Sequence, residues 1–379
     1  MLLEDFSFIT KEFVNRTQEL TYFNQLQQRL LDHTPRHVAL IGARRLGKSY
    51  LLFKYLYESS SPTIIPLYID TLYKRNWAEL SDDLIHSLLE NYRYCTKKSL
   101  HVDRFNTWLK GTFQEIVNRL QTIETEVGTQ AGTYVKLRAS LKEQPENEIQ
   151  LIQTSLKSLE EFAEKKKISL IVVFDEFQHI EKFKDMEETL AAMRAIIQVQ
   201  RHIQYIFCGS STTFMNNIFT KSTSAFWRQV DIVHLEPFTL DAVNALAKAR
   251  NLSLSTTEKQ VLHHLTRGIP DYLVKTIEKI STQKKKEKDI IPTAFDELVK
   301  QETPLFSDLF ERLPDLQQQV IISLAEGKHQ YHELEKDIGR KVGGILNQML
   351  YAQLIERSKK GWYDIFDPVF KASIQQRIQ

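Results

Sequence analysis

The stretch GARRLGKSY, residues 42–50, places a glycine at each end of a six-residue segment and follows the second glycine with lysine and serine. Gly42 to Ser49 match the pattern G-x-x-x-x-G-K-[ST] without a mismatch. The glycines let backbone N–H groups converge on phosphate oxygens, and a following helix adds its positive dipole end. HVALI (37–41) predicts a strand before the loop, and SYLLFKYLYE (49–58) predicts a helix after it. This context favours a phosphate-binding loop over a simple glycine-containing turn.

The loop predicts a nucleotide site with magnesium. Lys48 is expected to reach the β- and γ-phosphates, and Ser49 is expected to ligate Mg²⁺. The apolar segment ISLIVVFDE (168–176) ends in two acids, and ligands bind at the carboxyl edge of a parallel sheet. Asp175 is therefore expected to hold the Mg²⁺ shell, and Glu176 to orient and polarise the attacking water. Two acids at a strand end are a weak signal alone and a strong one beside this loop.

Two further segments offer polar groups. CGSSTTFM (208–215) contains Ser210 and Ser211, which are placed either to sense the γ-phosphate or simply to cap a helix. Arg228 precedes the last apolar segment of this region. It is expected to stabilise transferred charge in its own or a neighbouring subunit, the alternative being a surface arginine beside an aromatic ring.

Short apolar segments separated by helical patterns predict an α/β fold with a parallel sheet between helices, over residues 1–239. The segments are HVALI (37–41), TIIPLYID (63–70), ISLIVVFDE (168–176), IQYIFCGSS (203–211) and VDIVHLEPF (230–238). A long excursion over about 77–165 is expected to form a helical hairpin punctuated by Gly128, Gly132 and Pro145. Two stripes with helical spacing support it: Leu109, Phe113, Ile116, Leu120 and Ile123, then Ile149, Ile152, Leu156 and Leu159.

Helical patterns dominate after residue 240. DAVNALAKAR, STTEKQVLHHLTRG and YLVKTIEKI predict a helical lid over 240–305. The lysine cluster at 284–288 is most simply a solvated loop or helix end, the alternative being a contact with a phosphate backbone. LQQQVIISLA, YHELEKDI and GGILNQMLYAQLI predict three more helices, followed by a hairpin around Lys360-Gly361. This order over 306–379 resembles a winged helix-turn-helix.

The 379 residues allow two or three folding units. A formal charge of +2 gives no global reason to expect binding to nucleic acid or an anionic membrane. Cys95 and Cys208 form no CxxC pair, which fits a reducing compartment. The sequence shows neither a readable signal peptide nor an apolar run long enough to cross a bilayer, so we expect a cytoplasmic protein.

Together these residues resemble the archaeal-type ATPases of the STAND group within the AAA+ superfamily. The motifs that carry the resemblance are FVNRTQEL (13–20), GARRLGKS with its paired arginines, FDEFQHI (174–180), the Gly-Ser turn, Arg228, RGIPDYL (267–273) and YDIFDPVFK (363–371).

The resemblance implies strand order 5-1-4-3-2, with Arg16 lining the nucleotide pocket and with Gly268 and Pro270 closing over the base from the lid. Asn15 departs from the family pattern because it stands where glycine is usual, although asparagine tolerates positive φ. The lid also lacks the second-sensor arginine of many AAA+ proteins. The expected nucleotide-binding residues are Gly42, Ala43, Arg44, Arg45, Leu46, Gly47, Lys48, Ser49, Tyr50, Arg16, Ser210, Gly268 and Pro270.

The expected function is Mg-dependent ATP hydrolysis that drives a conformational or assembly switch regulating an unidentified partner. The alternative is an ATP-dependent DNA-binding protein of origin-recognition or transposition type, which would bind DNA through residues 310–379. That segment has ten basic and nine acidic residues, a net charge of 10 − 9 = +1, whereas a DNA-reading module usually has a clearly basic face. A small-molecule kinase is disfavoured because the paired acids, lid and winged helix would have no role.

Overall fold

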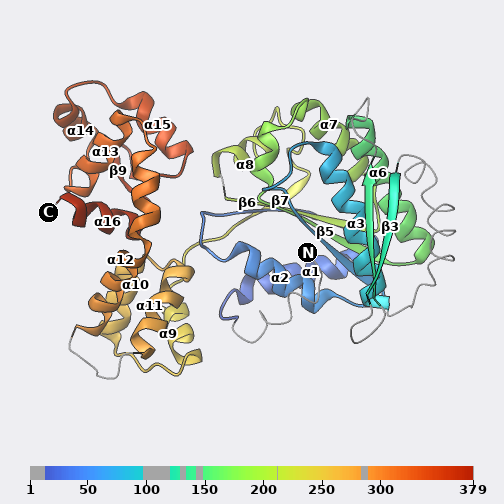
Figure 1. Ribbon diagram of the computed structural model, residues 1–379, viewed down its shortest axis with the longest axis horizontal. Coiled ribbons are helices and arrows are strands. Elements are labelled where there is room, and N and C mark those ends of the chain that lie inside the picture. The colour runs from blue at the N-terminus through green and yellow to red at the C-terminus, as the bar shows by residue number, and fades with distance from the viewer. Residues whose placement is uncertain are drawn as a thin grey trace. The chain divides into compact units, whose positions relative to one another are not determined.

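The computed structural model describes residues 13–96, 120–128, 134–141, 148–210, 212–282 and 289–378 (Figure 1). The chain forms two compact units. The first contains the residues up to Gly42 and Lys48–His234, and the second contains Ala43–Gly47 and Leu235–Gln379.

The first unit is built on a five-stranded parallel sheet of order β2-β5-β6-β1-β7. Its strands are β1 (His37–Ile41), β2 (Ile64–Asp70), β5 (Ser169–Asp175), β6 (Ile203–Gly209) and β7 (Val230–His234). Numbered among themselves, they run 2-3-4-1-5, which is the expected order 5-1-4-3-2 counted from the other edge. The five apolar segments of the sequence are therefore confirmed as strands.

Helices cover both faces of this sheet (Figure 1). They are α1 (Thr17–Leu31), α2 (Lys48–Ser59), α3 (Trp77–Thr96), α6 (Glu148–Lys166), α7 (Met186–Ile197) and α8 (Thr212–Phe219), with a 3₁₀ helix η3 (Phe177–Lys182) after β5. Figure 1 places α1 and α2 on one side of the sheet and α7 and α8 on the other. One buried cluster joins α3, α6, α7 and α8 to the sheet, and β1, β5 and β6 are buried along their whole length. Strands enclosed in this way need apolar residues on both faces, as the sequence has them.

The excursion between β2 and β5 differs from the helical hairpin expected from the sequence. α3 and α6 are helices, and Ile152, Leu156 and Leu159 of the second stripe are buried on α6. Between them, however, β3 (Leu120–Gly128) and β4 (Tyr134–Leu141) form an antiparallel hairpin. The helix predicted through Leu120 and Ile123 is therefore wrong, because Ile123, Thr125 and Val127 alternate with Glu124 and Glu126 at the two-residue period of a strand. Leu109, Phe113, Ile116, Gly132, Pro145 and the lysine cluster 284–288 lie outside the described residues.

The second unit is mainly helical. Its elements are α9 (Leu240–Ala249), α10 (Thr256–Thr266), α11 (Pro270–Thr282), α12 (Ile290–Glu311), α13 (Asp315–Ala325), α14 (Tyr331–Ile338), α15 (Gly343–Tyr351), β8 (Ile355–Lys359), β9 (Trp362–Ile365) and α16 (Pro368–Ile378). Ser255 and Glu258 form a capping box at the start of α10. The six predicted helices and the hairpin turning at Gly361 are all present. The expected boundary at 305/306 falls inside α12.

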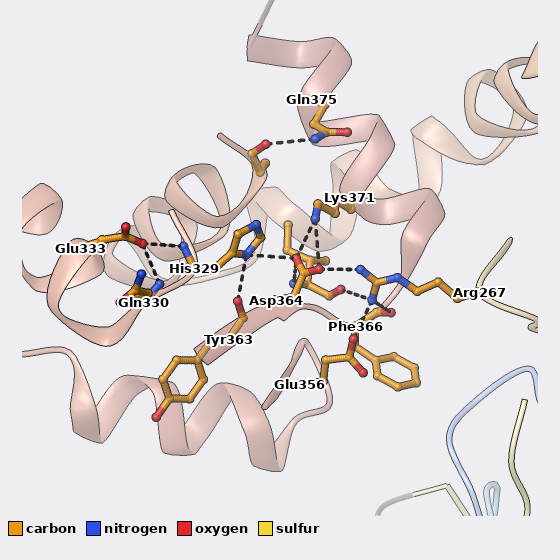
Figure 2. A network of polar contacts seen from close by, with 12 residues as sticks. Arg267, His329, Gln330, Glu333, Glu356, Tyr363, Asp364, Phe366, Lys371 and Gln375 are labelled. Carbon is orange, nitrogen blue, oxygen red and sulfur yellow. Dashed lines mark hydrogen bonds and ion pairs between the residues drawn. The ribbon is translucent and has the colours of Figure 1, made fainter. Parts of the chain in front are cut away.

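A polar network ties the turn between α10 and α11 to the β8–β9 hairpin (Figure 2). Arg267 follows α10, and its guanidinium donates to Glu356 Oε1 at 2.8 Å, Asp364 Oδ2 at 2.6 Å and the backbone carbonyls of Ile365 and Phe366 at 2.8 and 3.1 Å. Lys371 of α16 also donates to Asp364, at 2.8 Å. Within the second unit, one arginine therefore connects the helices α9–α12 to the C-terminal hairpin.

Candidate nucleotide-binding site

The loop after β1 has the local geometry of an anion-binding turn. β1 ends at Ile41 and α2 begins at Lys48, so the helix N-terminus follows the loop directly. Gly47 has φ +82°, and a Cβ there would meet nothing within 4 Å. Its requirement for glycine is thus conformational rather than steric. The loop can present backbone N–H groups and a helix dipole to a phosphate, as its sequence predicts.

Lys48 is buried at the start of α2, with 6% of its surface exposed. Its Nζ donates to the Gly42 carbonyl oxygen at 2.8 Å, across the loop. This contact joins the first residue of α2 to the glycine that begins the loop. The predicted position of Lys48 at the phosphate site fits this geometry.

Ser49 and Asp175 lie together at the end of β5. Ser49 Oγ donates to Asp175 Oδ2 at 2.7 Å, and the Asp175 side chain is buried. A hydroxyl and a carboxylate are oxygen ligands of the kind that Mg²⁺ prefers, with phosphate oxygens and water completing its shell. Among the described residues no three or more His, Cys, Asp or Glu side chains gather into a metal site. A magnesium ion held by one carboxylate, one hydroxyl and a nucleotide needs no such cluster, so the donor set fits.

Asp175 receives further hydrogen bonds from the residue that follows it and from the two strands beside it. Its Oδ1 accepts from the backbone N–H of Glu176 at 2.9 Å, and its Oδ2 accepts from the Tyr68 hydroxyl at 2.5 Å. The Cys208 side chain on β6 also hydrogen-bonds to Asp175, and burial raises the pKa of the Cys208 thiol well above its usual range. The thiol therefore keeps its proton and does not add a second charge beside the carboxylate.

Glu176 is held by two donors on its Oε2. Ser210 Oγ donates to it at 3.0 Å, and Gln178 Nε2 donates to the same oxygen. Gln178 Oε1 in turn accepts from the Ser210 backbone N–H at 3.2 Å. A Cβ on Gly209 would lie 2.6 Å from Gln178 Oε1, so only glycine leaves room for this arrangement. The structure brings the predicted Glu176 and Ser210 into direct contact, and Gln178 bonds to both.

Sequence reasoning missed Gln178 and Tyr68 as site residues. Gln178 stands inside the quoted FDEFQHI, but its role depends on a turn from another strand. Tyr68 looks like any residue of the buried strand TIIPLYID. The available signal was a polar group two residues after Glu176 and a hydroxyl near the end of the strand that pairs with β5.

The loop residues Ala43–Gly47 group with the second unit. Arg45 there has φ +67° and is bonded to the Tyr272 hydroxyl, with Glu302 at 3.5 Å and Asp367 at 3.6 Å. The pKa of the Asp367 carboxyl is raised above its ordinary value because burial disfavours its charge, and the Arg45 charge opposes this rise. Arg44 is exposed, Leu46 is buried and Tyr50 is 56% exposed. The sequence marks the two arginines as a family feature and as expected nucleotide-binding residues, and the structure gives Arg45 specific partners within the second unit.

The remaining predicted site residues lie in two regions. Arg16 is buried before α1 and pairs with Glu19 at 3.2 Å, and Asn15 has φ 69°, the left-handed conformation that a glycine would adopt. Arg228 is exposed and lies over the Trp227 ring at 4.4 Å. This contact matches the surface-arginine alternative and leaves the charge available to another molecule.

Gly268 and Pro270 lie at the turn into α11 of the second unit. Gly268 has φ +69°, and a Cβ there would lie 2.3 Å from the Phe238 carbonyl oxygen. Phe238 N–H donates to the Gly268 carbonyl at 2.7 Å. Pro270 is the first residue of α11, where its missing N–H costs no helical hydrogen bond. Both residues therefore have a structural reason for their identity, and their contact with a nucleotide stays a prediction, as for the other expected nucleotide contacts.

The sheet order, the loop between β1 and α2 and the acids ending β5 define a P-loop ATPase. The chain belongs to the family of ATPase domains found predominantly in Archaea, whose profile matches residues 13–276. The AAA+ ATPase expected from the sequence is confirmed at this level, and the chain is an ATPase.

Solved structures share the fold. One is a Walker-type ATPase of Pyrococcus abyssi, with 17% identity, a TM-score of 0.67 and 96% of each chain covered. The ORC2 protein of Aeropyrum pernix in ADPNP-ADP complexes has 14% identity and a TM-score of 0.55, covering 97% of this chain and 96% of that one. The ORC1 protein of the same organism in complex with DNA has 12% identity and a TM-score of 0.51, covering 98% and 94%. A comparison with curated proteins found no match. None of the described helices is long and apolar enough to span a bilayer.

Proposed function

We propose that this ATPase is a cytoplasmic switch of the STAND group. In this proposal Mg-dependent ATP hydrolysis changes its conformation or assembly and so regulates a protein partner. The observation that carries the proposal is the linked set of polar side chains at the carboxyl edge of the sheet. Within the first unit, Lys48 bonds to the Gly42 carbonyl, Ser49 bonds to Asp175, and Glu176 directly follows Asp175.

Each residue of this set has a distinct role. Lys48 binds phosphate oxygens, and Ser49 and Asp175 hold the metal shell, where a bound magnesium ion neutralises charge on the phosphates. Glu176 orients a water and accepts its proton. Ser210 carries a single hydroxyl proton, which it donates to Glu176 Oε2. That proton can serve Glu176 or a γ-phosphate oxygen, but not both, so Ser210 links the state of the nucleotide to the position of Glu176.

Binding is tested by calorimetric titration of ATP with Mg²⁺. Lys48→Ala should abolish binding, because no other group replaces the buried ammonium. Lys54→Ala is the matched control, since Lys54 lies on the same helix and pairs with Glu58 at 2.6 Å. Retained ATP binding in Lys48→Ala would overturn the assignment of the loop.

Hydrolysis is tested by phosphate release. Glu176→Gln should keep ATP bound and lower turnover by about 100-fold or more, the usual contribution of a general base. Glu188→Gln, an exposed glutamate on α7, should behave as the parent chain. Unchanged phosphate release in Glu176→Gln would remove Glu176 from this role.

Assembly is tested through Arg228. If Arg228 acts on a nucleotide in a neighbouring subunit, turnover per chain should rise with protein concentration, and the particle should grow when ATP is added. Arg228→Ala should remove the rise in turnover while ATP binding persists. A turnover independent of concentration in the parent chain would refute action between subunits.

DNA binding through a winged helix is the second candidate function, favoured by the surface of α15 and the hairpin. Asn347, Gln348 and Tyr351 are exposed at spacings that share one helix face. Exposed basic residues flank them: Arg340, Lys341, Arg357, Lys359 and Lys360. The net charge of the whole segment thus hides a local basic surface, which would contact phosphates while the helix face meets bases.

This candidate is tested by mobility shift of duplex DNA at low salt. Replacing both Lys359 and Lys360 by alanine should weaken binding and reduce the slope of log K against log salt by about 2. Lys300→Ala, on the exposed side of α12, is the control. If duplex DNA changes neither mobility nor ATP turnover, this second function is excluded.

A further inference from the structure

Tyr68 contacts Asp175 of the predicted magnesium site. It lies on β2, which α2 separates from the nucleotide loop in the sequence. It is 7% exposed and donates its hydroxyl to Asp175 Oδ2 at 2.5 Å. Its ring packs against Phe53 of α2, with ring centroids 4.8 Å apart. β2 also runs in register with β5, so that Tyr68 pairs with Val173. The position of this hydroxyl is therefore set by two packed elements.

The hydrogen bonds of Asp175 divide between its two oxygens. Oδ1 accepts the Glu176 N–H, Oδ2 accepts both the Tyr68 and Ser49 hydroxyls, and the Cys208 side chain also hydrogen-bonds to the carboxylate. A carboxylate oxygen has two lone-pair directions, and these two donors use both. A Ser49 oxygen can ligate a metal ion through a lone pair and keep its O–H bond to Asp175 Oδ2. With Ser49 and Asp175 holding the metal, Tyr68 would still fix Oδ2 and with it the orientation of the Asp175 carboxylate.

We propose that Tyr68 is a positioning residue of the magnesium site, which fixes the Asp175 carboxylate and thereby sets the affinity of the nucleotide site for Mg²⁺. This inference rests on the proposed function of Ser49 and Asp175. Partners that orient a metal-binding carboxylate commonly contribute 10- to 100-fold to metal affinity or activity. The tyrosine contributes no ligand of its own, so its effect depends on the metal and not on the nucleotide.

The experiment uses Tyr68→Phe in the full chain, which removes only the hydroxyl. A fluorescent ADP analogue is titrated in EDTA and at a series of Mg²⁺ concentrations. We expect the Mg²⁺ concentration for half-maximal tightening of nucleotide binding to rise by about 10- to 100-fold. Affinity in EDTA should stay within about twofold of the parent chain, because the phosphate contacts of the loop are intact.

Tyr205→Phe is the matched control. Tyr205 is fully buried on β6 and donates its hydroxyl to Gln200 at 2.9 Å, so this variant also loses one buried hydroxyl bond. Its Mg²⁺ dependence should equal that of the parent chain. The inference is wrong if Tyr68→Phe leaves the Mg²⁺ dependence unchanged or tightens it, or if Tyr205→Phe shifts it equally. A parent chain whose nucleotide affinity ignores Mg²⁺ would refute the proposed metal site itself, which separates the two failures.

Discussion

Arg267→Ala should loosen the β8–β9 hairpin from the helices of the second unit. The substitution removes a guanidinium that donates to two carboxylates, Glu356 and Asp364, and to two backbone carbonyls of the hairpin end. Opening of the hairpin breaks all four contacts at once. Its opening free energy should therefore fall by their combined net value.

The magnitude follows from exposure. The side chains of Arg267, Glu356 and Asp364 are 29%, 43% and 20% exposed, so each ion pair contributes about 0.5 to 1 kcal/mol. The bonds to the carbonyls contribute about 1 kcal/mol each. Lys371 continues to neutralise Asp364, which limits the loss there. The sum of about 3 kcal/mol corresponds to about a 100-fold lower protection of the hairpin amides against hydrogen exchange.

Hydrogen exchange followed by mass spectrometry measures this opening directly in peptides covering residues 355–366. Arg250→Ala is the control, since Arg250 makes an ion pair with Glu278 at 2.7 Å and Glu278 is 53% exposed. In the control, the hydrogen-exchange protection of the hairpin amides should stay within about threefold of the parent chain, because one exposed ion pair contributes under about 1 kcal/mol. Equal protection of the hairpin in the two variants would refute the role given to Arg267.

Three other predictions concern single residues. Gly268→Ala should lower the free energy of unfolding by at least about 1 to 2 kcal/mol in urea denaturation, because its backbone is left-handed and the new Cβ would meet the Phe238 carbonyl; an unchanged midpoint would contradict this. Gln178→Ala should slow single-turnover ATP cleavage more than it weakens ATP binding, since Glu176 loses one of its two donors; equal losses would argue against positioning. Burial lowers the pKa of His37 to about 4 from its ordinary 6.5, so the neutral ring is favoured in the folded state. Its contribution to stability is complete above pH 6.5 and is lost as the pH falls towards 4, by about 2 kcal/mol at pH 5, and His37→Asn should lack this part of the pH dependence.

The sheet could be predicted from sequence because its strands are buried on both faces. Segments such as ISLIVVFDE are apolar throughout, bounded by helical patterns, and end in polar residues at the site edge. The phosphate-binding loop could be predicted from Gly47 and Lys48, because a tight phosphate turn requires particular residues at fixed spacings. These features are local in the chain, so the sequence carries them directly.

The hairpin β3–β4 could not be separated from a helix by the same reasoning. Leu120 and Ile123 continue a spacing of three and four residues that begins upstream, while the two-residue alternation starts at Ile123. Both periods coexist over a few residues, and the longer one predicts a helix where the chain forms a strand. The contacts of Gln178 and Tyr68 were hidden for another reason, since each joins groups on different strands and depends on register that no local pattern reports.

The bond between Lys48 and the Gly42 carbonyl gives the loop a competitor built into its own backbone. A phosphate oxygen that displaced this carbonyl from the ammonium would add to affinity only the difference between two acceptors, whereas one bound by another of the three N–H groups would leave the carbonyl in place. When a product leaves, the buried Lys48 ammonium would return to the Gly42 carbonyl oxygen, 2.8 Å away in this structure, so its charge would not lose a hydrogen-bond acceptor. An ATPase that binds and releases nucleotide in every turnover would thereby bind phosphate less tightly and release its product more readily.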